Sequence, residues 1–374
     1  MRRVLIVAMA CVVASDANAQ GTVGGQGFGY PVTQQSARAA GSAGALAPFD
    51  EVSPVNPAEL ALWQRTVLFM HFEPEYRSSS IPGADVSTRL ARFPLTGAAA
   101  RVGSRGAIGV SFSTYLDRTW ETAAVTRDVV GEREVDVTTR YASDGAINDV
   151  RVAGAWAFSD RLRVGAGYHA YTGGNRMSIA WDFPETEPFG DVDQSSTLSY
   201  GGNAVSLGVT WRALRHIDVA VQQRFGGSAR VRVGDTLITR GEMPDHTGLA
   251  VRYDGIAGTL LAASWERIGW TAMRGLGSQD LRVRDGDRIS VGVETGGPQI
   301  ANTLVALRLG FAQRTLPFDA AGSKVTERLY AFGAGYPFAR GRGSANFALQ
   351  RAHRDAGDAR ERAWLIALGF TITP

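Results

Sequence analysis

The sequence contains few of the side chains from which metal centres and disulfide-stapled folds are built. Among its 374 residues there is one cysteine, Cys11, and there are five histidines. None of the histidines stands at metal-ligand spacing from a cysteine, a carboxylate or another histidine, and the G-x-S-x-G motif of serine hydrolases is absent. These absences argue against a metalloenzyme. The enzymatic alternative that stays open is a hydrolase site assembled from serine, histidine and aspartate residues on different strands.

The first residues have the pattern of a secretory signal. Arg2-Arg3 form a basic start, Val4–Ala14 is a short apolar run and Ala17-Asn18-Ala19 is a small-x-small cleavage site. We therefore expect residues 1–19 to be a signal peptide and the mature chain, beginning near Gln20, to have no cysteine, no disulfide and no thiolate metal site. Lipidation within Ala8-Met9-Ala10-Cys11 is a disfavoured alternative, because the apolar run before the cysteine would be very short.

Positive charge is carried almost entirely by arginine, and the two signs nearly cancel. Lys324 is the only lysine, and the chain has 39 basic and 36 acidic residues, of which the expected signal removes Arg2, Arg3 and Asp16. This balance does not predict nucleic-acid binding, which calls for a basic patch or stripe. No stretch of 18 uninterrupted apolar residues follows the signal, so no transmembrane helix is expected. With 45 glycines and no helical periodicity, the sequence predicts an exported all-β protein.

The stretch 303–314 shows the strand pattern most clearly. Its odd positions from 305 to 311 are Val305, Leu307, Leu309 and Phe311, and the intervening positions are small or cationic: Ala306, Arg308, Gly310, Ala312 and Arg314. A strand sends alternate side chains to opposite faces, and a membrane-crossing strand has ~9–11 residues. The pattern predicts that the four apolar side chains face lipid and that the small or cationic ones face a lumen.

The same alternation recurs along the chain and predicts about fourteen antiparallel strands. Short and long connections alternate, with long loops expected at 172–196, 225–246 and 271–287. This asymmetry, aromatic residues near strand ends and faces of Gly, Ala, Ser and Arg favour a transmembrane β-barrel over a soluble sandwich. The expected strands lie near 65–76, 86–95, 106–126, 132–158, 161–171, 204–211, 219–224, 247–253, 259–270, 288–295, 303–314, 325–338, 344–352 and 362–372.

The segment 20–63, which precedes the expected barrel of residues 64–374, is interpreted as a plug. It is rich in Gly, Ala, Ser and Gln, and it is long for a structureless tether. Pro57 at the first helical position and Asn56 as its cap predict one or two helical turns over Ala58–Trp63. A simple linker to the barrel is the alternative.

Three groups of motifs resemble the FadL-like family of outer-membrane transporters for long-chain fatty acids and other hydrophobic compounds. They are Gly27–Pro31 with Ser36–Gly41 and Asn56–Ala61, then Arg314–Phe318 with Val325–Glu327, and the closing strand Trp364–Thr371. The resemblance implies a 14-stranded barrel in the bacterial outer membrane, plugged by its own N-terminus, with Asn56, Pro57 and Ala58 in the hatch. The chain departs from the usual barrel ending because it closes on Thr373-Pro374, which leaves Phe370 as the last aromatic residue.

Candidate functional residues fall into three sets. The hatch or gate is Asn56, Pro57 and Ala58. Aromatic residues of the expected outer loops are candidates for ligand capture, because exposed apolar patches often mark binding sites: Trp181, Phe183, Phe189, Trp270 and Phe318. Polar residues of the lumen are expected either to solvate the interior or to hold the hatch and attract a carboxylate head group: Arg151, Arg163, His169, Glu266, Arg308 and Arg314, with Asp149 as a further partner.

The sequence thus predicts a passive outer-membrane channel for a hydrophobic, fatty-acid-like small molecule. The molecule would be captured at the outer loops and would pass a movable hatch, with no cofactor, no metal and no catalysis; the surrounding partner is outer-membrane lipid. The alternative from another class is a structural or partner-binding barrel, such as a secretion-system component, because a fold alone does not fix a function. A general hydrophilic porin is disfavoured by the plug-like segment.

Overall fold

The computed structural model describes residues 23, 28–81, 84–130, 133–184, 190–276, 281–320 and 322–374. The expected signal peptide, residues 1–19, and Phe189 lie outside these residues. No helix among the described residues is long and apolar enough to cross a membrane.

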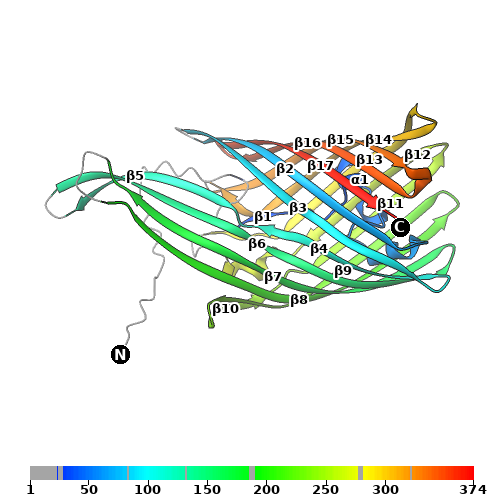
Figure 1. Cartoon of the computed structure of the whole chain (residues 1–374), viewed down its shortest axis with the longest axis horizontal. Coiled ribbons are helices and arrows are strands. Elements are labelled where there is room, and N and C mark those ends of the chain that lie inside the picture. Colours follow the sequence, from blue (N-terminus) through cyan, green and yellow to red (C-terminus); the bar gives the residue numbers. More distant parts are fainter. Residues whose placement is uncertain are drawn as a thin grey trace.

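In the described part of the chain, fourteen antiparallel strands close into a barrel, as the alternation predicts (Figure 1). Each strand pairs with a neighbour on both sides. The last strand, β17, pairs with the first barrel strand, β2, and this pairing closes the ring. Closure leaves no open edge, which a hydrocarbon layer could not solvate. The strands are β2 (Val67–Ile81), β3 (Ala84–Val102), β4 (Gly106–Asp117), β6 (Arg133–Ser159), β7 (Leu162–Asp182), β8 (Val192–Leu214), β9 (Ile217–Val233), β11 (His246–Ile256), β12 (Thr259–Ile268), β13 (Gly286–Ile300), β14 (Thr303–Ala320), β15 (Ser323–Phe338), β16 (Gly343–Ala356) and β17 (Ala359–Ile372).

Apolar side chains cover the outer face of the barrel. In β17, Trp364, Leu368 and Phe370 are exposed, whereas Leu365 and Ala367 between them are buried. In β14, Leu309 is 57% exposed, but Val305 is only 8% exposed. Val305 alternates in step with Leu309, because β14 itself has no extra residue between them, so it belongs to the outer face. Its side chain is covered there, beside a bulge in β13 between Gly296 and Gln299.

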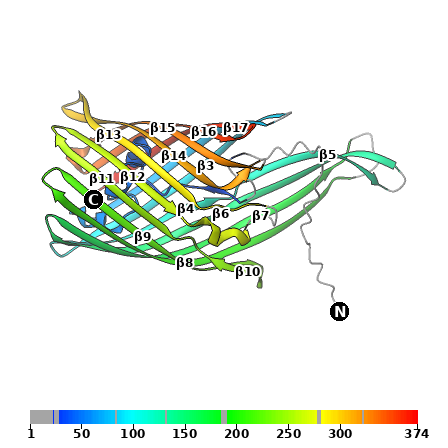
Figure 2. The same cartoon turned by 180° about the vertical axis from the view of Figure 1, so that it is seen from behind.

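One end of the barrel carries short turns, such as residues 160–161, 215–216 and 257–258, and we take it as the periplasmic end. At the other end the strands continue far beyond the wall, and the hairpin of β5 (Trp120–Val130) with β6 projects furthest (Figures 1 and 2). The third expected strand, 106–126, is therefore two elements, because β5 leaves the ring and β6 takes its place beside β4.

The three long outer loops expected from the sequence are largely ordered structure. Residues 172–182 and 192–196 extend β7 and β8, and residues 225–242 belong mostly to β9 and to β10 (Thr236–Glu242). The third connection differs: its described residues, 269–276 and 281–285, begin with the 3-10 helix η3 (Trp270–Leu276) and contribute a single β-bridge, from Val283 to Phe318. The alternation is weak in these extensions because both faces of a strand above the membrane can meet water.

The N-terminal segment lies inside the ring of strands. It comprises β1 (Tyr30–Pro31), α1 (Ala37–Gly41), η1 (Ala47–Phe49) and η2 (Pro57–Leu62), and most of its residues are buried. The helical turn expected after Asn56 is confirmed: Asn56 Oδ1 accepts from the Ala58 amide at 3.1 Å. The wall opposite this segment is small, and a Cβ atom placed on Gly310 or Gly165 would collide with the backbone of Ser42 or Pro57.

Two exposed residues of the outer face test the position of the membrane. Leu309→Arg puts a charge near mid-height, and we expect the free energy of unfolding from a bilayer to fall by ~2–4 kcal/mol. Ile372→Arg, which is similarly exposed but pairs with Gly343 beside the short connection 339–342, should cost about 0–1 kcal/mol. Denaturant titration in lipid vesicles measures both, and equal losses would contradict this placement of the bilayer.

Candidate functional site: the plugged lumen

The C-terminal half of the plug is fixed to the wall by neutral and charged hydrogen bonds. Asn56 Nδ2 donates to Thr210 Oγ1 at 2.9 Å, and the same hydroxyl donates to Glu59 at 2.5 Å. Arg163 Nη2 also donates to Glu59, at 3.0 Å. Since Gly165 and Gly208 face Pro57 and Asn56 without side chains, the expected hatch residues Asn56–Ala58 sit directly against the wall.

Around α1 the wall supplies further partners. Arg38 donates through Nε and Nη2 to Glu294 at 3.0 and 2.8 Å, and Arg308 Nε donates to the same carboxylate at 2.5 Å. The Ala37 amide donates to His71 Nδ1 at 2.9 Å, and Gln350 Nε2 donates to the Ala40 carbonyl at 2.7 Å. The plug is thus held by contacts from opposite sides of the ring.

Tyr30 of the plug is enclosed by arginines of the wall. Its ring lies 4.3–5.1 Å from four guanidinium carbons, those of Arg77, Arg92, Arg314 and Arg354. Its hydroxyl accepts from Arg314 Nη2 at 2.5 Å and donates to Glu327 at 2.9 Å. Burial raises the pKa of Tyr30, so the hydroxyl stays protonated and can donate.

Carboxylates balance these four arginines. Arg354 donates to Glu75 at 2.9 Å and to Glu327 at 2.6 Å, and it also pairs with Glu361. Arg77 and Arg92 both pair with Glu75, and Arg92 reaches Asp117 at 2.6 Å. We call Tyr30, the four arginines and these carboxylates the tyrosine cage. Removing one partner of a buried ion pair typically costs ~3–5 kcal/mol, so these pairs hold the wall arginines in place around Tyr30.

Asp149, His169 and Ser206 form a buried chain of hydrogen bonds across three strands. His169 Nδ1 lies 2.9 Å from Asp149 Oδ2, and its Nε2 lies 2.9 Å from Ser206 Oγ. The order matches a serine hydrolase triad, but the strand backbone around Ser206 is used in ladders with β7 and β9, which leaves no evident pair of amides for an oxyanion. Asp149 also accepts from Gln34 of the plug at 2.9 Å. We therefore interpret the chain as a further clamp on the plug.

The six lumen residues expected from the sequence do not form one ladder with Asp149 and Glu266. Arg163 pairs with Glu59 of the plug, Arg308 with Glu294 and Arg314 with Glu327. Glu266 lies 3.6 Å from His246. Arg151 is buried, and its Nη1 has no hydrogen-bond partner among the described residues. The charges therefore lie in separate clusters. Which residues pair depends on the register between strands, and the sequence pattern does not reveal that register.

The residues expected for ligand capture occupy different positions from those predicted. Trp181 belongs to β7 and Phe318 to β14, so neither is a loop residue, and Phe183 directly follows β7. Trp270 starts η3, but its side chain is buried. Phe28 of the plug packs on both Trp270 and Phe318, with ring centroids 6.1 and 6.3 Å apart. Trp270 and Phe318 therefore form an apolar layer inside the outer end of the lumen.

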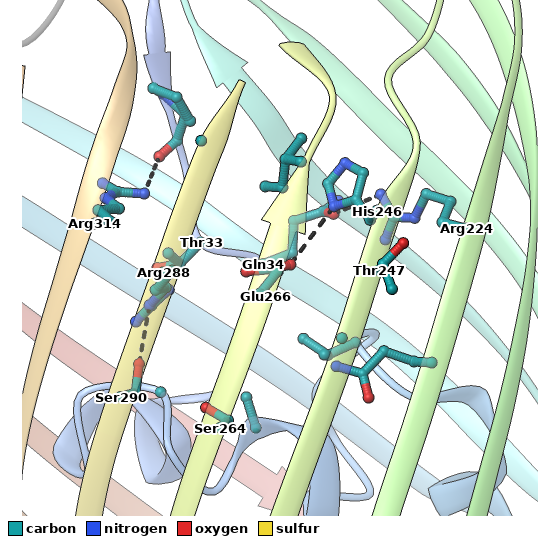
Figure 3. Close-up of a pocket in the computed structure, with 18 of the residues that line it drawn as sticks. Thr33, Gln34, Arg224, His246, Thr247, Ser264, Glu266, Arg288, Ser290 and Arg314 are labelled. Carbon is teal, nitrogen blue, oxygen red and sulfur yellow. Dashed lines mark hydrogen bonds and ion pairs between the residues drawn. The ribbon is translucent and has the colours of Figure 1, made fainter. Parts of the chain in front are cut away.

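Below this layer lies a cavity of about 100 Å³ between the plug and strands β8, β9 and β11–β14 (Figure 3). Its apolar lining includes Tyr115, Trp270 and Leu316. Polar groups form the rest of the lining, and Figure 3 shows several of them: Thr33, Gln34, Arg224, His246, Thr247, Ser264, Glu266, Arg288, Ser290 and Arg314. We call it the inner cavity.

A second, open cavity of about 730 Å³ lies at the periplasmic end of the same wall sector, between Arg212 and Ala306. The plug segment Ser42–Phe49 separates the two cavities, and we call it the stopper. Phe49 packs on Ala220 and Ala250, and Leu46 packs on Ala262. The stopper is thus held by apolar packing on small wall residues, by the Arg252 guanidinium 5.0 Å from the Phe49 ring, and by a hydrogen bond of 2.8 Å from Arg288 to the Ala43 carbonyl. None of these contacts is an ion pair.

The tyrosine cage is the main feature that the sequence argument missed. One signal was available: Glu73, Glu75 and Arg77 follow one another at alternate positions of the first strand, so they share a face. Nothing in the sequence indicates which arginines of distant strands they meet. Among the described residues, no group of histidine, cysteine and carboxylate side chains could hold a metal ion.

A closed antiparallel barrel with short turns at one end and an internal N-terminal segment defines an outer-membrane β-barrel protein. Its structure is similar to a FadL homologue of Pseudomonas aeruginosa, with a TM-score of 0.66 and 13% identity over 92% of this chain and 99% of that chain. It is also similar to the toluene transporter TodX of P. putida, with a TM-score of 0.61 and 14% identity over 92% of this chain and 99% of that chain. A third similar structure is the monoaromatic hydrocarbon channel CymD, with a TM-score of 0.56 and 13% identity over 91% of this chain and 98% of that chain.

These likenesses confirm the FadL-type barrel fold expected from the motifs. Neither a family model nor a curated protein sequence matches the chain.

Tyrosine substitutions test the cage. Tyr30→Phe removes the hydrogen bond that Tyr30 accepts from Arg314 and the one that it donates to Glu327, although these two wall residues stay paired with each other. We expect the binding of the plug to the wall to weaken by about 1–3 kcal/mol. Tyr30→Ala should weaken it further, because the ring over four guanidinium groups is lost as well. Trypsin cleavage after Arg38 in the folded protein measures release of the plug. Tyr253→Phe, on the exposed outer face, is the control, and equal cleavage in all variants would contradict the assignment.

Proposed function

We propose that this protein is a channel for the passive uptake of hydrophobic small molecules across the outer membrane. The observation that carries the proposal is the pair of cavities on one wall sector, with the stopper packed on the wall between them. The similar barrels TodX and CymD are described as a toluene transporter and a monoaromatic hydrocarbon channel, which supports the same class of substrate.

Capture begins at the outer end of the lumen, where Trp181 and Phe183 lie above the apolar layer of Trp270 and Phe318. A hydrophobic molecule that leaves the lipopolysaccharide layer gains apolar contacts there. Phe189 belongs to the same outer connection in sequence and completes the proposed capture set. Diffusion down a gradient then needs no cofactor and no energy source.

Passage requires movement of the stopper. The tyrosine cage and the ion pairs of Arg38 and Glu59 hold the plug on either side of it. Leu46 and Phe49 are almost fully buried, and withdrawing each from the wall costs ~1.5–3 kcal/mol. A hydrophobic solute that takes their place restores much of this burial. In this mechanism Asn56–Ala58 form the fixed base of the hatch, and Ser42–Phe49 form its moving part.

The long outer extension favours the partner-binding alternative. Strands β6, β7 and β8 have 27, 21 and 23 residues, whereas ~9–11 residues suffice to cross the bilayer. A protein partner could add to this surface. Uptake of a radiolabelled hydrophobic compound by cells that carry the protein, compared with cells that carry an empty vector, decides between the two functions; no difference would favour the partner-binding barrel.

Deleting the plug tests whether it closes the lumen. A variant that lacks residues 20–55 should conduct small ions freely through planar bilayers, because nothing else described in the structure fills the centre of the ring. The intact protein should conduct little. Equal conductance in both would show that the segment does not close the channel.

A reversible staple tests movement of the stopper. A Cβ atom added at Gly292 would lie 3.1 Å from the Cβ atom of Ala45. This distance is a few tenths of an ångström shorter than the Cβ–Cβ distance of ordinary disulfides. We expect Ala45→Cys with Gly292→Cys to block uptake when oxidised and to restore it when reduced. Ala45→Cys alone is the control. Uptake that is independent of the redox state, with the disulfide verified by mass spectrometry, would show that the stopper stays in place.

A further inference from the structure

The charged side chains around the inner cavity already have partners. Arg224 donates to Tyr171 and Gln34 at 3.1 Å, and Arg314 donates to Glu327 at 2.6 Å. Arg288 uses Nε and Nη2 on Ser290 and on the Ala43 carbonyl, at 3.1 and 2.8 Å. A carboxylate entering the cavity would have to compete with these contacts.

Two neutral groups of the lining lack partners. Gln35 Nε2, a donor, and Gln222 Oε1, an acceptor, make no hydrogen bond with the described residues, although their residues are only 4% and 8% exposed. Both residues line the cavity, Gln35 from the plug and Gln222 from strand β9 of the wall. Buried polar atoms without partners are uncommon, and a bound molecule that both donates and accepts would satisfy them.

The remaining lining and the volume restrict the size of that molecule. Tyr115, Trp270 and Leu316 offer an apolar surface for a ring. The volume of about 100 Å³ is smaller than the ~150 Å³ of a protein cavity known to hold benzene. A single six-membered ring therefore enters only with a small outward shift of the lining, and anything larger is excluded while the stopper is closed.

We propose that the inner cavity is a binding subsite for a small monocyclic compound with a neutral hydroxyl group, a phenol. Its ring lies against Trp270 and Leu316, and its hydroxyl meets the free carboxamide atoms of Gln35 and Gln222. This inference rests on the proposed function and narrows its substrate from hydrophobic compounds in general, including the fatty-acid-like molecules that the motifs suggest, to neutral compounds with one hydrogen-bonding head.

Isothermal titration of the intact, detergent-solubilised protein with three ring compounds tests the subsite. Phenol should bind about tenfold more tightly than toluene, since one buried hydrogen bond contributes roughly that factor, and benzoate should bind more weakly than phenol. Gln222→Leu and Gln35→Leu should each reduce the preference for phenol over toluene. Gln223→Leu is the matched control, because Gln223 Oε1 already accepts from Thr247 at 2.6 Å.

Each other outcome overturns the inference. Equal binding of phenol and toluene would mean that water satisfies the two carboxamides, and tighter binding of benzoate would make the cavity an anion site. Uptake of toluene and phenol by cells is measured in parallel. Uptake without a preference for phenol over toluene would contradict the subsite and leave the channel function intact. Absence of any uptake would contradict the proposed function itself.

Discussion

A hydrocarbon layer offers no hydrogen-bond partner to a peptide group, and the architecture of this protein depends on that constraint. Every wall strand must pair on both sides, so the sheet closes on itself. Closure with this number of strands produces a ring that its own inward side chains do not fill. The N-terminal segment fills the centre, and the small residues along the inner wall, such as Gly165, Gly310 and Ala250, allow its backbone to approach.

Two kinds of attachment then divide the plug. Buried charges fix Tyr30, Arg38 and Glu59, and such contacts are demanding in geometry and costly to break singly. Leu46 and Phe49 are held by apolar packing and by the Arg252 guanidinium over the Phe49 ring, contacts that are less directional than ion pairs. In the proposed function, an apolar solute of suitable size replaces them. The buried charges thus fix the position of the plug, while the contacts of Leu46 and Phe49 with the wall are the ones that are easier to replace.

Much of the barrel was predictable because lipid imposes strict alternation on the strands that cross it, as in Trp364–Ile372 and 303–314. The alternation is weak where that constraint ends, in the extensions of β7 and β8 above the membrane. The sequence also does not mark the bulge in β13 beside which Val305 is covered. Asn56 and Pro57 were found because capping is local. The tyrosine cage was not, because its partners on β2, β3, β14 and β16 meet only through the register of the closed sheet.

The stopper is fastened on both sides, by the tyrosine cage and the Arg38–Glu294 pair before it and by Asn56 and Glu59 after it. A strap fastened at both ends cannot swing open as a door does; it can only bow. In the proposed mechanism the opening is therefore limited by the length of chain between the two sets of anchors, which sets an upper size for the solute independently of its chemistry. Because the anchors stay in place, the same apolar contacts can form again once the solute has left.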